Sequence, residues 1–265
     1  MTTGKNRGAR FAFALLLGML CLPAVAANPL RETVVCWEDG LKPPYLMLDP
    51  SSRPTGIAVD MVDEIFRRKS VKVKHVIRPW KRCLAEVESG EVDLVPNSSY
   101  REERARYALY SDPLYETHLV LFYTHRRFPD PPKITRIDDL KAFRLGGILG
   151  FNYDQYEGIL SIDTSARNRR TLVRMLEVDR YDFVIEQLEI IRMMEARGEI
   201  RLNGIGHTPD PVTPTKKFHV LVSKRHPDAR QLKKILDEGI AGLQRDGTSR
   251  RINARYLGPG DLPQQ

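Results

Sequence analysis

The chain has 265 residues, with 42 Lys and Arg against 34 Asp and Glu, and a formal net charge of +8. This length is ample for a buried core, in one large domain or in two lobes of ordinary size. A moderately basic protein of this kind suits anionic lipid, acidic partners or small anionic solutes. The six histidines form no close pair at helical spacing, so we expect no metal site.

The first 26 residues have the pattern of a secretory signal peptide. Three basic residues precede an apolar run, residues 11–25, which is shorter than the ~20 residues that span a bilayer as a helix. Residues 24–26 (Ala-Val-Ala) supply the small side chains that signal peptidase requires. We therefore expect a signal peptide at residues 1–26, cleavage near Ala26, a periplasmic protein and no nucleic-acid partner.

After the signal peptide, strand-like and helix-like segments alternate. Ile57, Met61 and Ile65 form one apolar stripe at helical spacing. We expect strands at residues 33–37, 71–77 and 92–95, and helices at residues 57–68, 81–89 and 102–107. This order of strands and helices predicts a mostly parallel sheet covered by helices.

The same order restarts after a long strand, residues 117–124, and a loop rich in Pro and Arg, residues 126–133. A second turn-rich stretch, residues 204–215, precedes the last strand. We expect helices at residues 138–141, 171–176 and 190–197, strands at residues 145–149, 182–185 and 218–223, and a closing helix with Leu232, Ile235, Leu236, Ile240 and Leu243 on one face.

Two α/β units separated by two turn-rich stretches predict two lobes joined by two crossings. We expect residues 27–124 to form the first part of lobe 1, residues 125–216 to form lobe 2, and residues 217–265 to return to lobe 1. Such an arrangement offers a hinge and a cleft between the lobes, which is a common place for a small ligand.

Two cysteines, Cys36 and Cys83, remain after removal of the signal peptide. An even number of cysteines in an oxidising compartment favours a disulfide. Neighbouring parallel strands would bring the end of the first strand close to the start of the helix that follows the second. Two buried free thiols are the alternative, because sequence spacing alone does not fix the geometry.

The sequence contains none of the common enzyme motifs. It has no Gly-x-Ser-x-Gly, no His-Glu-x-x-His and no phosphate loop. The glycines at residues 146–150 follow a strand, and we interpret them as a tight turn. We therefore expect neither catalysis nor a cofactor.

The most specific stretch follows the strand at residues 92–95. Asn97 and Ser99 provide short hydrogen-bonding side chains there, and Arg104 comes shortly afterwards. In open α/β sheets, ligands bind beyond the carboxyl ends of strands, and Arg presents a planar two-pronged donor that matches a carboxylate. The functional interpretation is a carboxylate site; the alternative for Arg104 is a surface arginine.

Two basic clusters lie on helix-like stretches, and we expect most of their side chains to form a solvated face. The clusters are Arg101, Arg104 and Arg106, and Arg167, Arg169, Arg170 and Arg174.

Nearly the whole mature chain resembles the family 3 solute-binding proteins, the polar amino acid receptors of ABC transporters. The resemblance is carried by the order and spacing of several short motifs, at residues 43–45, 56–60, 90–93, 104, 111–115, 138–141 and 243–248. It implies a two-lobe type 2 periplasmic binding protein fold, each lobe a mostly parallel sheet flanked by helices. It also implies a small-molecule solute, an ABC permease partner in the inner membrane, and a monomer.

The resemblance also assigns site residues. Arg104 would hold a ligand carboxylate with help from Ser99 and Asn97, and Glu186 matches the family's ammonium-binding aspartate. Aromatic side chains would pack against the ligand: Tyr45, and also Trp37 or Trp80.

Several residues depart from the family's pattern. Phe151 and Asn152 stand where the family has Gly-Thr or Gly-Ser at a helix start, and we expect both to line the site. Arg101 replaces a threonine, and Lys42 replaces a ligand-stacking aromatic. These changes, together with the longer side chain of Glu186, indicate a ligand that is larger, more polar or more acidic than an ordinary α-amino acid.

Two other functions remain open from the sequence. Cyclohexadienyl dehydratase-like enzymes resemble this chain in fold, and their chemistry needs a general acid, for which Glu186 or Glu38 is available. A receptor that signals to a membrane sensor kinase is the second alternative, because nothing in the sequence separates signalling from transport.

Overall fold

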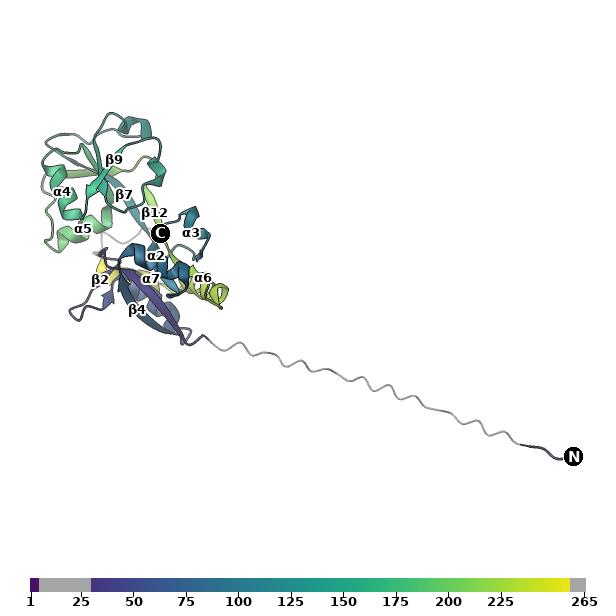
Figure 1. The fold of residues 1–265 in the computed structure, drawn as a ribbon. Coiled ribbons are helices and arrows are strands. Elements are labelled where there is room, and N and C mark those ends of the chain that lie inside the picture. Colours follow the sequence, from purple (N-terminus) through teal and green to yellow (C-terminus); the bar gives the residue numbers. More distant parts are fainter. Residues whose placement is uncertain (5–29, 258–265) are drawn as a thin grey trace.

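The computed structural model describes residues 1–4 and 30–257. The apolar run and the cleavage site of the predicted signal peptide lie outside the described residues. Residues 30–257 form two α/β lobes, one above the other in Figure 1. The predicted two-lobe α/β fold is confirmed.

The first lobe contains both the beginning and the end of the described chain. Its elements are β1 (Glu32–Glu38), β2 (Met47–Leu48), β3 (Pro54–Thr55), α1 (Ile57–Arg67), β4 (Lys72–Arg78), α2 (Trp80–Ser89), β5 (Leu94–Ser98), α3 (Glu102–Ala105), β6 (Ala108–Tyr110), β12 (Thr215–Ser223), α6 (Ala229–Arg245) and α7 (Thr248–Tyr256). β1 pairs in parallel with β4 and β5, whereas β12 runs antiparallel to β5 and β6.

The second lobe lies between the two long strands of the chain. Its elements are β7 (Tyr115–Thr124), the 3₁₀ helices η1 (Ile137–Leu140) and η2 (Asp154–Tyr156), β8 (Leu145–Ile148), β9 (Ile162–Ala166), α4 (Arg169–Glu177), β10 (Phe183–Gln187), α5 (Leu188–Ala196) and β11 (Ile205–Pro209). β8 pairs in parallel with β9 and β10, whereas β7 runs antiparallel to β10 and β11.

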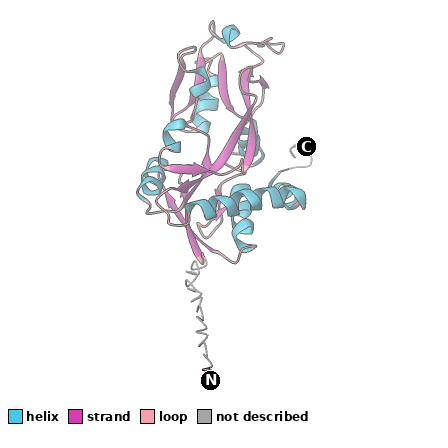
Figure 2. Cartoon of the chain, turned by 90° about the vertical axis from the view of Figure 1, so that its right-hand side faces the viewer, coloured by secondary structure: helices cyan, strands magenta, loops and turns pink. Residues whose placement is uncertain are grey.

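β7 and β12 are the two crossings between the lobes. Residues 115–118 of β7 pair antiparallel with residues 215–218 of β12. Beyond this contact β7 continues into the second lobe and β12 into the first, and Figure 2 shows long strands running from one lobe to the other. The two antiparallel crossings make each sheet mixed, with three parallel strands in each lobe.

Each lobe has its own apolar core, covered by amphipathic helices. In the first lobe, the predicted stripe of α6 is buried and packs against α1. Gly239 permits the close approach of these helices, because a Cβ there would lie 2.5 Å from the side chain of Ile65. In the second lobe, Leu172 of α4 and Ile190 of α5 are fully buried. None of the helices in the described chain is long and apolar enough to cross a membrane.

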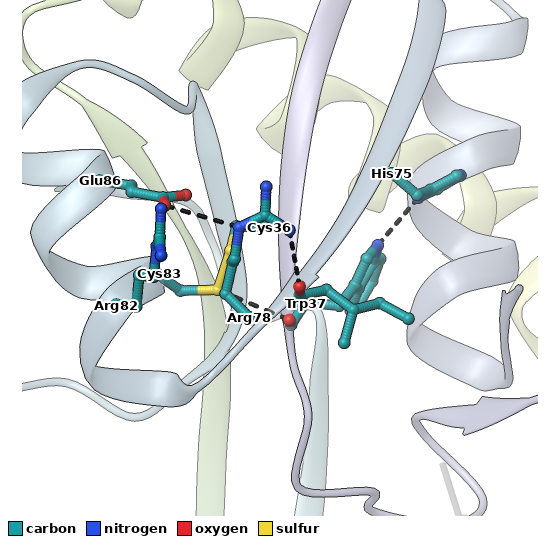
Figure 3. Close-up of a disulfide and its surroundings, with 8 residues drawn as sticks. Cys36, Trp37, His75, Arg78, Arg82, Cys83 and Glu86 are labelled. Atoms are coloured by element: carbon teal, nitrogen blue, oxygen red, sulfur yellow. Dashed lines mark hydrogen bonds and ion pairs between the residues drawn. A yellow bond between two sulfur atoms is a disulfide. The ribbon is translucent and has the colours of Figure 1, made fainter. Parts of the chain in front are cut away.

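A disulfide joins β1 to α2 in the first lobe (Figure 3). The Cα atoms of Cys36 and Cys83 are 5.7 Å apart, and both residues are fully buried. Side chains alternate between the two faces of a strand, so Trp37, the neighbour of Cys36, packs on the opposite side of the sheet. There its Nε1 donates a hydrogen bond to Nδ1 of His75 at 2.8 Å.

Candidate functional site

A cavity of about 450 Å³ lies between the lobes. Pockets that bind small ligands commonly have volumes of roughly 300–1,000 Å³. The first lobe and its crossing strand contribute residues 38–43, Met47, Leu48, Trp80, Asn97, Ser99, Arg104 and Phe218. The second lobe contributes residues 148–152 and 167–169, Met194, Arg197 and Glu199.

Arg104 reaches the cavity from α3, just beyond the carboxyl end of β5. Its Nη1 donates to Ser98 Oγ at 3.1 Å and to the carbonyl oxygen of Ser99 at 3.2 Å. The side chain is only 7% exposed, yet its Nε has no hydrogen-bond partner in the described chain. A buried guanidinium N–H without a partner is costly, so this atom is a candidate donor to a ligand.

Asn97 supplies a second buried donor beside Arg104. It adopts a left-handed backbone conformation with φ of 59°, and it is 3% exposed. Its Oδ1 accepts a 2.9 Å hydrogen bond from the hydroxyl of Tyr115, whereas its Nδ2 has no partner in the described chain. Burial raises the pKa of Tyr115. The hydroxyl therefore stays protonated and leaves the Asn97 amide N–H₂ free.

Aromatic rings support the first-lobe wall of the cavity. The Arg104 guanidinium lies over the Trp80 ring, with 5.4 Å between Cζ and the ring centroid. Phe218 lines the cavity and stacks on Tyr115, which in turn stacks on Tyr45 with centroids 5.1 and 4.0 Å apart. The wall is thus backed by a column of three rings.

Two of the predicted aromatic contacts lie away from the cavity wall. Tyr45 is buried two rings behind Phe218, and its hydroxyl donates to the carbonyl oxygen of Glu116. Trp37 is 1% exposed in the apolar core of the first lobe, because the alternation of β1 turns it away from the face of Cys36. Trp80, by contrast, lines the cavity.

Glu186 lies behind the second-lobe wall. Its side chain is completely buried, and one carboxylate oxygen is 2.9 Å from Nε of Arg169. The other carboxylate oxygen accepts a hydrogen bond from the backbone N–H of Gln187. Arg169 lines the cavity and covers the carboxylate. The member of this ion pair that lines the cavity is therefore Arg169.

Further charged residues of the cavity were not singled out as ligand contacts from the sequence. Lys42 Nζ lies 2.7 Å from a carboxylate oxygen of Glu38, and Arg197 Nε lies 2.8 Å from a carboxylate oxygen of Glu199. Arg167, which the sequence assigned to a solvated face, is exposed and lines the cavity, and Arg169 lines it with a side chain that is 12% exposed. The sequence did contain a signal for this location, because Arg167 and Arg169 stand at the start of a helix that follows a strand.

Phe151 and Asn152 lie on the turn after β8, and Tyr153 fixes that turn. The Tyr153 hydroxyl accepts a 2.9 Å hydrogen bond from the Ile148 N–H and donates to the Ile185 carbonyl oxygen at 3.1 Å. Gly147 makes room for it, because a Cβ there would lie 2.5 Å from the Tyr153 hydroxyl.

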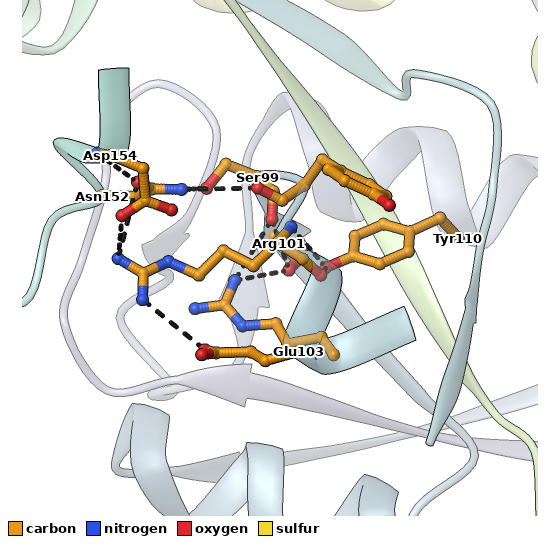
Figure 4. A network of polar contacts seen from close by, with 9 residues as sticks. Ser99, Arg101, Glu103, Tyr110, Asn152 and Asp154 are labelled. Carbon is orange, nitrogen blue, oxygen red and sulfur yellow. Dashed lines mark hydrogen bonds and ion pairs between the residues drawn. The ribbon is translucent and has the colours of Figure 1, made fainter. Parts of the chain in front are cut away.

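The same turn contacts the first lobe directly beside the cavity (Figure 4). Asn152 Nδ2 donates to Ser99 Oγ at 3.1 Å, and an Arg101 terminal nitrogen lies 2.6 Å from Asp154 Oδ1. Lys216 of β12 donates to the carbonyl oxygen of Asn152, and its burial lowers its pKa to about 8. These contacts hold one edge of the cleft closed.

The described residues contain no group of His, Cys, Asp and Glu side chains that could hold a metal ion. The residues that line the cavity carry amide and guanidinium N–H groups and the ammonium of Lys42.

Comparison with known proteins extends the likeness over most of the chain. It is 22% identical over 234 residues to the L-cystine-binding protein TcyJ of Escherichia coli K12, covering 86% of this chain and 84% of that protein. Two solved structures are similar in fold. One is a histidine kinase sensor domain with similarity to periplasmic binding proteins, with a TM-score of 0.68, 20% identity, and coverage of 87% and 98% of the two chains.

The other solved structure is an ABC uptake transporter substrate binding protein from Streptococcus pneumoniae with bound histidine. Its TM-score is 0.67 at 20% identity, with 88% of this chain and 95% of that chain covered. The model of the bacterial extracellular solute-binding proteins, family 3, matches residues 34–259. The protein therefore belongs to the bacterial extracellular solute-binding proteins, family 3.

Proposed function

We propose that the protein is an exported, monomeric receptor that captures a small polar, carboxylate-bearing solute in the interlobe cavity and delivers it to an ABC permease of the inner membrane. The observation that carries this proposal is that two residues lining the cavity, Arg104 and Asn97, each have a buried N–H donor without a hydrogen-bond partner in the described chain. A ligand carboxylate would satisfy both.

The binding step follows from the two-lobe architecture. A ligand that contacts both walls favours the closed arrangement over open ones, in proportion to the difference in its affinity for the two. Arg104, Asn97 and Ser99 would hold the carboxylate on the first lobe, and Trp80 and Phe218 would pack against its carbon chain. Phe151 and Asn152 would close over it from the second lobe.

Signalling and catalysis are less well supported. The likeness to a histidine kinase sensor domain, at 20% identity, concerns the fold. The two acids available for a dehydratase reaction are both engaged, Glu38 by Lys42 and Glu186 by Arg169. A general acid must reach the bound substrate, and Glu186 is completely buried behind Arg169. We therefore propose binding without turnover of prephenate, arogenate or amino acids.

A thermal-shift screen tests the receptor proposal. Protein purified from the periplasm would be heated with amino acids, amines, organic acids and small peptides. A ligand at 100 times its Kd adds about 2.7 kcal/mol to the free energy of unfolding, which raises the Tm clearly. We expect carboxylate-bearing compounds to raise the Tm of the wild type but not of Arg104→Ala. A screen in which no compound raises the Tm contradicts the proposal.

A further inference from the structure

The cavity is lined by more cations than anions. The basic residues that line it are Lys42, Arg104, Arg167, Arg169 and Arg197, and the acidic residues are Glu38, Asp39 and Glu199. In a cavity with low-dielectric walls, such a surplus favours an anionic ligand.

The acidic residues that line the cavity offer little to a ligand ammonium. Glu38 is held by Lys42 at 2.7 Å, and Glu199 by Arg197 at 2.8 Å. Asp39 is exposed to solvent. An ammonium would therefore have to break an ion pair or accept a solvated partner.

On the second-lobe wall, positive charge gathers at the start of α4. Arg169 is the first residue of this helix, Asn168 is its N-cap, and both line the cavity beside Arg167. The N-terminus of a helix carries a partial positive charge that favours anions. Arg167 forms no ion pair within the described chain.

The first-lobe wall supplies an independent indication of a ligand. Arg104 is 7% exposed and Asn97 is 3% exposed, and each has a buried N–H donor without a hydrogen-bond partner in the described chain. Residues with N–H donors therefore line both walls of the cavity, Arg104 and Asn97 on one lobe and Arg167 and Arg169 on the other.

We infer that the solute is a small dianion with an acidic group at each end, one bound by Arg104 and Asn97 and the other by Arg167 and Arg169. This inference rests on the proposed receptor function and narrows its ligand. A dianion would bridge the lobes, so that closure brings both acidic groups into charge-assisted hydrogen bonds at once. Arg169, which is held in place by Glu186, would occupy the position of an ammonium-binding carboxylate.

Calorimetry with matched probes tests this inference. The dianions are glutarate and 3-phosphonopropionate, which separate a dicarboxylate from a phosphonate ligand. Their comparison compounds are glutaramate, which is glutarate with one end made neutral, and the zwitterionic or cationic L-glutamine, L-cystine and L-arginine. We expect a dianion to bind about tenfold or more tightly than glutaramate.

Two variants locate the second acidic group. Arg167→Gln removes an exposed charge, and the double variant Arg169→Gln with Glu186→Gln removes Arg169 without leaving a buried carboxylate unpaired. We expect the double variant to weaken dianion binding about tenfold or more and Arg167→Gln to weaken it less. Arg230→Gln, the same charge change as Arg167→Gln at an exposed residue of α6, is the control and should stay within about twofold.

The outcomes separate this inference from the receptor proposal. The dianion inference is wrong if a zwitterion or cation binds more tightly than either dianion. It is also wrong if the double variant binds a dianion as tightly as the wild type does. Neither result contradicts the receptor proposal. Failure of every probe to bind counts against both.

Discussion

The two walls of the cleft hold their arginines in different ways. On the first lobe, Arg104 is anchored by neutral oxygens of Ser98 and Ser99 and keeps a free N–H. On the second lobe, Arg169 is bound to the fully buried carboxylate of Glu186. Arg104 can therefore be removed without leaving an opposite charge behind, whereas Arg169 cannot.

A residue that serves mainly to bind the ligand and a residue that also supports the fold thus line the same cavity. Removal of Arg104 should affect mainly ligand affinity. Removal of Arg169 should affect both the ligand and the fold, because a buried charge without its partner is strongly destabilising.

The largest expected effect on stability comes from Arg169→Ala. It leaves Glu186 completely buried and unpaired, and such a loss typically costs about 3–5 kcal/mol in the free energy of unfolding. Urea unfolding measures it. The double variant with Glu186→Gln should recover most of the loss, since the buried charge is gone. If the free energy of unfolding of Arg169→Ala lies within about 1 kcal/mol of the wild-type value, Glu186 is not left as an uncompensated buried charge in that variant.

Loss of the Cys36–Cys83 disulfide should destabilise the first lobe. The bond spans 47 residues, and a disulfide of this kind contributes about 2–4 kcal/mol by restricting the unfolded chain. The second lobe contains no cysteine, so hydrogen exchange after reduction should rise first in the first lobe. Before reduction, mass spectrometry should find neither cysteine alkylated in periplasmic protein; two alkylated thiols would refute the bond.

Lys216, at the contact between the lobes, should make stability depend on pH. Burial lowers its pKa from 10.5 to about 8, so between these values the unfolded chain binds the additional proton. The free energy of unfolding should therefore rise with pH across this window, by up to about 3 kcal/mol. Other groups titrate in the same range, so the measure is the difference between wild type and Lys216→Met. A difference that is flat from pH 7 to pH 10 would contradict the assigned pKa.

The smallest effect is expected from Arg101→Ala. Its ion pair with Asp154 joins the lobes, but the two side chains are 30% and 47% exposed, and such pairs contribute about 0–1 kcal/mol. Ligand affinity should fall by no more than about fivefold, through a faster dissociation rate. A double-mutant cycle with Asp154→Asn isolates the pair, and a coupling energy well above 1 kcal/mol would mean that this contact governs closure.

The sequence predicted most of the fold because its periodic segments were long. The apolar stripe of α6 and the stripe of α1 both matched buried faces, with boundaries within a few residues. β9 and β11 were missed because their side chains are mostly half-exposed and polar, and give no alternation to detect. α7 was missed for a related reason, since only two of its nine residues are buried.

The candidate site was only partly accessible to the same reasoning. The stretch from Asn97 to Arg104 is local in sequence, so its convergence on the cavity could be expected from the strand end alone. The side of the sheet to which Trp37 turns depends on the register of β1. The ion pair between Arg169 and Glu186 is a tertiary contact between α4 and β10, and no local sequence pattern encodes it.

Calorimetric titration of Arg104 variants with a ligand identified by the screen tests the central claim most directly. Arg104→Ala should bind that ligand about 30-fold to several-thousand-fold more weakly, the equivalent of ~2–5 kcal/mol, with its unfolding midpoint little changed. Arg104→Lys should recover only part of the loss, because an ammonium does not reproduce the two-pronged contact. Binding by Arg104→Ala within about threefold of wild type would contradict the assignment of the carboxylate site.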